Sequence, residues 1–120
     1  MNYKGYDLPD ELRYNKDSSW VRLEGEEATV GIIEPIAKTV KEFLFVKLPE
    51  KGRIKKGDTY VSLEALKWSG HLTSPLSGEI TAVNQELFDE PGKINEAPYD
   101  AWIMKLKPDN KEEVEELHKP

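Results

Sequence analysis

Apolar and polar residues alternate along residues 59–66, and this is the clearest structural pattern in the chain. An alternation of period two predicts a β-strand, because successive side chains of a strand point to opposite faces. One predicted face carries Val61, Leu63 and Ala65, and the other carries Tyr60, Ser62 and Glu64. We expect only one of these faces to cover the core.

Further strands are predicted where β-rich segments lie between turn residues. The apolar run at residues 43–48 is typical of a buried strand. The other segments are 20–23 and 28–33, which form a predicted hairpin, then 78–83 and 102–106. Many short strands between turns favour a sandwich or a barrel, so the predicted fold class is mainly β.

The predicted helices are few, short and peripheral. Residues 34–40 carry Pro35 near the first helical position, where proline is tolerated. Residues 109–118 form a predicted terminal helix whose early acidic residues complement the helix dipole, and its acidic face is expected to be solvated. Residues 88–99 contain three turn-forming residues and are predicted to be a loop.

Composition narrows the class of protein. A chain of 120 residues fits a single domain. The net charge of -6 argues against a nucleic-acid partner, and no stretch approaches the roughly 18 apolar residues of a membrane span. No signal-peptide pattern is present, so a cytoplasmic protein is expected. We also expect the protein to be a monomer. The absence of cysteine excludes disulfides and thiolate metal sites, and we expect no metal site.

Lys67 lies between two predicted extended segments, so its amine is expected at the tip of a β-hairpin. Taken alone, this position says little, because most turn lysines are solubilising charges. The neighbouring residues make it informative. Glu64-Ala65-Leu66-Lys67, followed by residues 74–80, resembles the lipoyl-attachment hairpin of the glycine cleavage H-protein family.

The resemblance extends over residues 8–107. Residues 14–21 resemble the opening strand of the family, and further similar segments follow in the family's order at residues 30–32, 45–49, 84–87, 94–99 and Trp102. The resemblance implies a hybrid barrel-sandwich fold of the lipoyl- and biotinyl-domain type. It also implies a non-catalytic carrier with lipoate bound covalently to Lys67, which shuttles an aminomethyl group between glycine cleavage enzymes.

Three segments depart from the family pattern. Trp68 follows the lysine directly, residues 99–102 are shortened, and Lys41-Glu42-Phe43 replaces a Gly-Asp pair. The sequence Lys67-Trp68-Ser69-Gly70 resembles instead the H-like lipoate-binding proteins of sulfur-oxidising, heterodisulfide-reductase-like systems. On this ground the sequence slightly favours the sulfur-oxidation subgroup, with the glycine cleavage carrier as the alternative.

Several neighbours of Lys67 have two interpretations each. Glu64 is either read by the attaching enzyme or simply solvated. Trp68 either shields the arm or packs across the hairpin, and His71 either protonates sulfur or has no special role. Gly70 and Gly78 are expected to allow positive φ or a tight bend.

The resemblance implies a particular set of partners. They are a lipoate ligase or lipoyl transferase, dihydrolipoamide dehydrogenase, and either a heterodisulfide-reductase-like complex or the glycine cleavage enzymes. An unmodified interaction domain remains the alternative from another class. A biotin carrier fits less well, because Leu66 and Trp68 stand where that family has methionine. An independent enzyme is not indicated, because no nucleophile motif or phosphate-binding loop is present.

Overall fold

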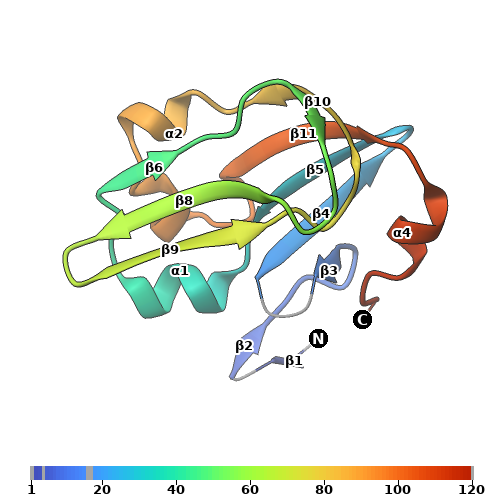
Figure 1. The fold of residues 1–120 in the computed structure, drawn as a ribbon. Helices are drawn as coiled ribbons and strands as arrows, with labels where there is room; N and C mark the ends of the chain where they lie inside the picture. The colour runs from blue at the N-terminus through green and yellow to red at the C-terminus, as the bar shows by residue number, and fades with distance from the viewer. Residues whose placement is uncertain (1, 4, 16–17, 120) are drawn as a thin grey trace.

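The computed structural model describes residues 2–3, 5–15 and 18–119. Lys16 and Asp17, which lie in the segment 14–21 that carries part of the family resemblance, fall outside the described residues. Most strands belong to two sheets, and short helices lie around their periphery (Figure 1). Among the described residues, no helix is long and apolar enough to cross a membrane.

The larger sheet has six strands in the order β3-β4-β5-β11-β10-β7, and every neighbouring pair is antiparallel. Its strands are β3 (Arg13–Asn15), β4 (Ser19–Glu24), β5 (Glu27–Ile32), β7 (Gly52–Ile54), β10 (Gly78–Val83) and β11 (Trp102–Pro108). The predicted hairpin at the start of the chain is confirmed by the pairing of β4 with β5. Gly25 lies in its turn with a φ of 65°, a conformation that glycine adopts without strain.

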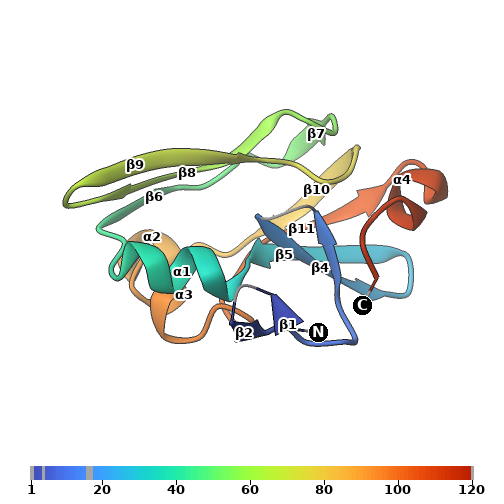
Figure 2. The same cartoon turned by 90° about the horizontal axis from the view of Figure 1, so that it is seen from below.

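The smaller sheet has three antiparallel strands in the order β6-β8-β9. These strands are β6 (Phe45–Lys47), β8 (Thr59–Ala65) and β9 (Trp68–Thr73). Two further short strands, β1 (Asn2–Tyr3) and β2 (Tyr6–Asp7), pair with each other. Figure 2 shows the smaller sheet as one layer and β4, β5 and β11 as a second layer facing it.

Four helices complete the fold of the described residues: α1 (Glu34–Val40), α2 (Glu86–Asp89), α3 (Lys93–Glu96) and α4 (Lys111–Glu115). The turn between β8 and β9 lies at one end of the molecule, and α4 lies at the other, in both views (Figures 1 and 2). The predicted helix at residues 34–40 is confirmed, with proline in its first turn. The mainly β, sandwich-like fold is therefore confirmed.

The core lies between the two sheets and draws apolar side chains from both of them. Its members are fully or almost fully buried, and they include Val21, Val30, Ile32, Val46, Val61, Leu63, Leu76, Ile103 and Leu106. Burial of such side chains is the main favourable term in folding, at about 1.5–3 kcal/mol for each fully buried one. A smaller cluster, around Trp20 and Tyr14, packs beneath the first strands.

The smaller sheet differs from the sequence-based prediction in two places. Residues 43–48 do not form a buried strand, because β6 spans only residues 45–47 and its Phe45 and Lys47 side chains are exposed. One face of this sheet meets the core and the other meets solvent, so an apolar run cannot be buried on both sides. On β8, Tyr60 is buried beside Val61, because the register shifts between Thr59 and Val61 and interrupts the alternation.

The peripheral helices also differ from the prediction. Residues 88–99 are not a continuous loop, since they include the end of α2 and all of α3. The predicted helix at 109–118 is shortened to α4, which begins after an Asn110 cap that accepts a hydrogen bond from the Glu112 N–H. Its acidic residues are not all solvated, because Glu113 accepts hydrogen bonds from the Ser77 N–H and hydroxyl at 2.9 and 3.1 Å.

Candidate functional site

Lys67 lies in the two-residue turn between β8 and β9, where Ala65 pairs with Trp68 across the closing position. The other turn residue, Leu66, is 85% exposed, the highest value among the exposed large apolar side chains. No hydrogen bond or ion pair between described residues involves the exposed Lys67 amine. Lys67 therefore lies in the turn of the β8–β9 hairpin, as the sequence predicted. Figure 1 shows this hairpin projecting at one end of the molecule.

A groove of about 620 Å³ opens beside this turn. It is bounded by the end of α1, by the segment that leads into β6 and by the turn itself, with the lining residues Thr39, Val40, Lys41, Glu42, Leu44, Ala65, Leu66, Lys67 and Trp68. Apolar side chains contribute much of this lining, and three of them, Leu44, Leu66 and Trp68, are exposed. The groove can thus accept an apolar group that is tethered to the lysine.

The backbone on the far wall of this groove is strained. Lys41 has a φ of 74° and a ψ of -61°, and the Glu42 N–H donates to the Val40 carbonyl at 3.0 Å. These values describe a γ-turn of the uncommon kind in which a non-glycine residue has positive φ. Such strain persists only where the surroundings hold it, and it tends to occur at functional sites.

Trp68 lies with its ring over Gly70 of its own strand, and the ring also contacts Phe43, in the segment before β6. Its ring is 39% exposed, and its centroid lies 6.0 Å from that of Phe43, with a tilt of 58° between the planes. A Cβ atom at Gly70 would lie only 2.8 Å from Cζ2 and 2.9 Å from Cη2 of this ring. The ring thus rests directly on Gly70.

The two glycines near the hairpin have roles other than the predicted ones. Neither Gly70 nor Gly78 has positive φ. Gly70 leaves room for the Trp68 ring, and Gly78 allows close approach to β11, since a Cβ there would lie 2.1 Å from the Lys107 carbonyl oxygen. At both positions the chain needs the absence of a side chain and not an unusual backbone conformation.

Phe43, the partner of Trp68, is held by a buried amide. The Phe43 N–H donates to Oδ1 of Asn95 at 2.8 Å, and Nδ2 of Asn95 donates to the Ala37 carbonyl at 2.8 Å. Asn95 is only 8% exposed, and it joins α3, the middle of α1 and the segment before β6. The sequence placed Phe43 in a predicted buried strand and Asn95 in a predicted loop. It did not bring them together, because the hydrogen bonds of the Asn95 amide join residues 52 and 58 positions apart.

The candidate residues around Lys67 divide between the two faces of the hairpin. Glu64 pairs with Ser69, and Ser62 pairs with His71, so Glu64 and His71 share the outer, exposed face. Trp68 and Gly70 lie on the opposite face, towards the groove. The Glu64 side chain is exposed. Recognition of Glu64 by an attaching enzyme requires this exposure.

The base of the hairpin is anchored to the larger sheet. The Tyr60 hydroxyl on β8 and the Ser19 hydroxyl on β4 lie 2.7 Å apart in a buried hydrogen bond. Burial raises the pKa of Tyr60, so its phenol stays neutral at ordinary pH. Since a buried hydrogen bond fixes the base, the tip keeps a defined position relative to the core. Among the described residues, no cluster of histidine or carboxylate side chains is suited to a metal ion.

Comparisons with a family model and with related proteins all point to the same family. The model of the glycine cleavage H-protein family matches residues 12–120. The chain is 44% identical over 115 residues to a probable glycine cleavage system H protein of Aeropyrum pernix, covering 94% of this chain and 80% of that protein. It is 40% identical over 112 residues to the glycine cleavage system H protein of Staphylococcus epidermidis, covering 92% and 89%.

A solved structure agrees with these relatives. The crystal structure of a glycine cleavage system H protein from Mycobacterium marinum superposes with a TM-score of 0.79, at 29% identity, covering 85% of this chain and 87% of that one. The slight preference for the sulfur-oxidation subgroup is not supported by these comparisons, and the glycine cleavage alternative fits them better. The chain belongs to the glycine cleavage H-protein family.

Proposed function

We propose that this chain is the lipoyl carrier of a glycine cleavage system and that Lys67 is its attachment site. The observation that carries the proposal is an exposed lysine amine in a two-residue hairpin turn, in a chain of the H-protein family. As a carrier, the protein acts as a substrate of partner enzymes and does not catalyse the reaction. Its partners are then the attaching enzyme, the glycine cleavage enzymes and dihydrolipoamide dehydrogenase.

The residues around Lys67 fit a lipoyl group. The exposed amine is accessible for acylation. The Lys67 ammonium first loses a proton to solvent, and its nitrogen then bonds to the carbonyl carbon of a lipoyl group that ATP has activated as an adenylate. The bond to AMP breaks, AMP leaves with the bonding electrons, and the resulting amide carries no positive charge. Leu44, Leu66 and Trp68 offer an apolar wall beside that amine. When attached, the lipoyl group supplies a dithiol that can be reversibly oxidised and can carry a transferred group.

This chain contributes location and orientation. The Tyr60–Ser19 hydrogen bond fixes the base of the hairpin, and the Trp68 ring on Gly70 supports the groove face next to the turn. A tether on a fixed turn makes delivery to a docked enzyme effectively intramolecular, with local concentrations of the order of millimolar. The carrier therefore has to present the arm and leave it free to move between enzymes.

Intact-protein mass spectrometry and peptide mapping test the attachment. After coexpression with a lipoate ligase, we expect the mass to rise by one lipoyl group located on Lys67. Lys67→Arg should abolish the increase, because a guanidinium is not acylated by the ligase. Lys41→Arg is the matched control, since Lys41 lines the same groove, and it should still be modified. An unchanged mass would identify an unmodified interaction domain, and modification elsewhere would refute the assignment.

Reconstitution with the other glycine cleavage enzymes tests the pathway. The lipoylated carrier should support glycine-dependent release of carbon dioxide by glycine decarboxylase at a rate comparable with that of a standard H protein. The unmodified carrier is the control and should support little release. A fully lipoylated carrier that glycine decarboxylase does not use would refute the glycine cleavage assignment and leave the attachment site intact.

A further inference from the structure

The β9 strand is an open edge of the smaller sheet, directly beside Lys67. In the order β6-β8-β9 it has β8 on one side, and no described strand pairs with its other side. It begins at Trp68, the residue that follows the lysine. An open strand edge presents unpaired backbone donors and acceptors to any extended chain that approaches.

The pairing shows which backbone groups of β9 face this open side. The Glu64 carbonyl accepts the Leu44 N–H at 2.8 Å, so the backbone groups of Glu64 point away from β9. Its partner Ser69 therefore occupies a pair without direct hydrogen bonds, and the Ser69 N–H and carbonyl point outward. By the same alternation, the backbone groups of His71 also point outward.

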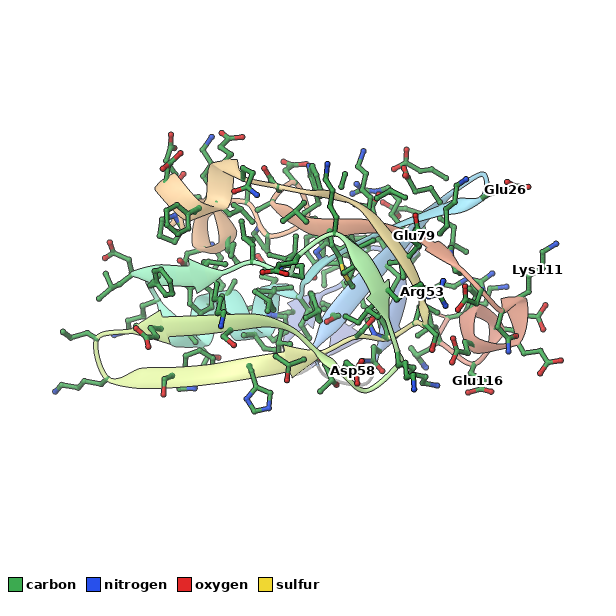
Figure 3. All side chains as sticks on the ribbon, turned by 45° about the horizontal axis from the view of Figure 1, so that its top comes forward. Glu26, Arg53, Asp58, Glu79, Lys111 and Glu116 are labelled. Carbon is green, nitrogen blue, oxygen red and sulfur yellow. The ribbon has the colours of Figure 1, made fainter. Side chains whose placement is uncertain are left out.

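The other three edges of the six- and three-stranded sheets are protected. On β3, Tyr14 exchanges two backbone hydrogen bonds of 2.9 Å with His118. On β7, the Arg53 side chain (Figure 3) is paired with Asp109. On β6, the exposed Lys47 is closely followed by Pro49. Charged residues, proline and covering segments are the usual means by which proteins prevent unwanted strand pairing.

No such protection is found on β9, whose sequence Trp-Ser-Gly-His-Leu-Thr contains no lysine, arginine, acidic residue or proline. Among the described residues, no hydrogen bond uses the outward backbone groups of Ser69 or His71. The one unprotected edge among these four lies next to the proposed attachment site. An unprotected strand edge directly beside Lys67 is therefore a candidate binding surface.

We propose that the β9 edge binds an extended segment of the enzyme that attaches lipoate, which adds to the smaller sheet as a fourth strand. The inference rests on the proposed function. The segment would bond to the Ser69 and His71 backbone groups. Its side chains on the groove side would be apolar, to meet Trp68 and Leu72, and those on the outer side would be polar, like Ser69 and His71.

The attaching enzyme is the partner that the geometry favours. It must bring its active site to the unmodified lysine side chain, so it has to approach the hairpin itself. Enzymes that use the finished lipoyl arm can act from farther away, because the arm is much longer than the bare side chain. Backbone pairing also aligns the partner along the strand, and strand addition fixes register through main-chain hydrogen bonds. The enzyme would thereby select Lys67 from the 14 lysine residues of the chain.

Amide hydrogen exchange, measured residue by residue by NMR, tests this proposal. Unmodified carrier is mixed with a lipoate ligase that modifies it, without lipoate or ATP. The Ser69 and His71 amides should exchange quickly in the free carrier and about tenfold or more slowly in the complex. Free exchange at both amides in a ligase complex that does form would overturn the proposal, although Lys67 lipoylation would still support the proposed function. Slowing that depends on carrier concentration alone would indicate a second copy and would also overturn it.

A substitution provides the second test. Ser69→Pro removes the outward N–H at an edge position where proline is tolerated, and it should lower the lipoylation rate about tenfold. Ser69→Ala keeps the N–H and is the matched control, with a rate close to that of wild type. A folded Ser69→Pro variant that is lipoylated at the wild-type rate would refute the proposal. If that variant does not fold, the exchange measurement decides. If Lys67 of the wild type is never lipoylated, the proposed function fails, and this inference fails with it.

Discussion

Replacing Gly70 with alanine changes the contact that supports the Trp68 ring beside the proposed attachment site. The new methyl group would lie 2.8 and 2.9 Å from two ring carbons, whereas carbon atoms prefer separations of about 3.5–4.0 Å. The ring must therefore move by about 1 Å. Because Trp68 is 39% exposed, it can move towards solvent and away from Phe43.

The cost of this movement follows from the contacts that are lost. An aromatic pair such as Phe43 and Trp68 contributes about 0.5–1.5 kcal/mol. Alanine regains roughly 0.5–1 kcal/mol in a strand, because glycine loses more backbone entropy on folding. We expect Gly70→Ala to lower the free energy of unfolding by no more than about 1 kcal/mol. The tryptophan emission should shift to longer wavelength as the Trp68 ring becomes more exposed.

Gly31 provides the matched comparison, since a Cβ there would lie 2.3 Å from the Trp20 ring. That ring is 0% exposed, and its Nε1 donates to the Pro98 carbonyl at 2.9 Å. It has no route to solvent, so the same methyl group must overpack the core or break the hydrogen bond. Gly31→Ala should therefore destabilise the protein by about 2–4 kcal/mol.

Urea denaturation followed by circular dichroism measures both variants, and steady-state fluorescence reports the ring. The emission change of Gly70→Ala should vanish in a Trp68→Phe background, which removes the reporting ring. A loss of 2 kcal/mol or more for Gly70→Ala would contradict the reasoning that an exposed ring can yield. So would an unchanged emission spectrum, because it would mean that Trp68 does not rest on Gly70.

Two further predictions concern groups that hold the fold around the site and at its opposite end. Asn95→Ala should lower the free energy of unfolding by roughly 2–4 kcal/mol, since it leaves two buried backbone groups without partners, and urea denaturation should show an earlier midpoint with an unchanged slope. Hydrogen bonds from Arg53 lower the pKa of Asp109 in the folded protein. The Asp109 carboxylate therefore stabilises the folded state at pH values above the pKa that it has in the unfolded chain. This stabilisation is lost as the pH falls through the lower pKa of the folded state. Asp109→Asn should therefore lower the midpoint of thermal unfolding slightly at pH 7 and leave it unchanged in strong acid. If the variant and the wild type differ by the same amount at both pH values, the ion pair is not the cause of the difference.

Much of the local structure could be read from the sequence, because it depends on neighbouring residues. Alternation predicted β8, a proline in the first turn predicted α1, and the β-rich segments around Gly25 predicted the β4–β5 hairpin. The position of Lys67 in a turn was readable for the same reason. What turned this lysine into a candidate site was its ordered set of neighbours across most of the chain.

Hydrophobic runs and alternation gave wrong predictions of burial where the packing of the strands decides which side chains are buried. The apolar run that includes Phe45 predicted a buried strand, but the strand covers the core with only one face and Phe45 is exposed. The alternation on β8 placed Tyr60 away from the core, but a register shift turns it inward to meet Ser19. Neither outcome can be read from period alone, since each depends on how a strand meets its partner.

The sequence by itself determined the type and order of most strands and helices. It also determined that Lys67 lies between two strands. Only the tertiary structure decided what lies around that lysine. Trp68 rests on Gly70 and against Phe43, and Asn95 ties together segments that are far apart in the chain. Among the four edge strands of the six- and three-stranded sheets, only β9 is left open. The physical reason is that propensity and alternation act over a few residues, whereas ring contacts, buried amides and sheet edges arise when distant segments pack together.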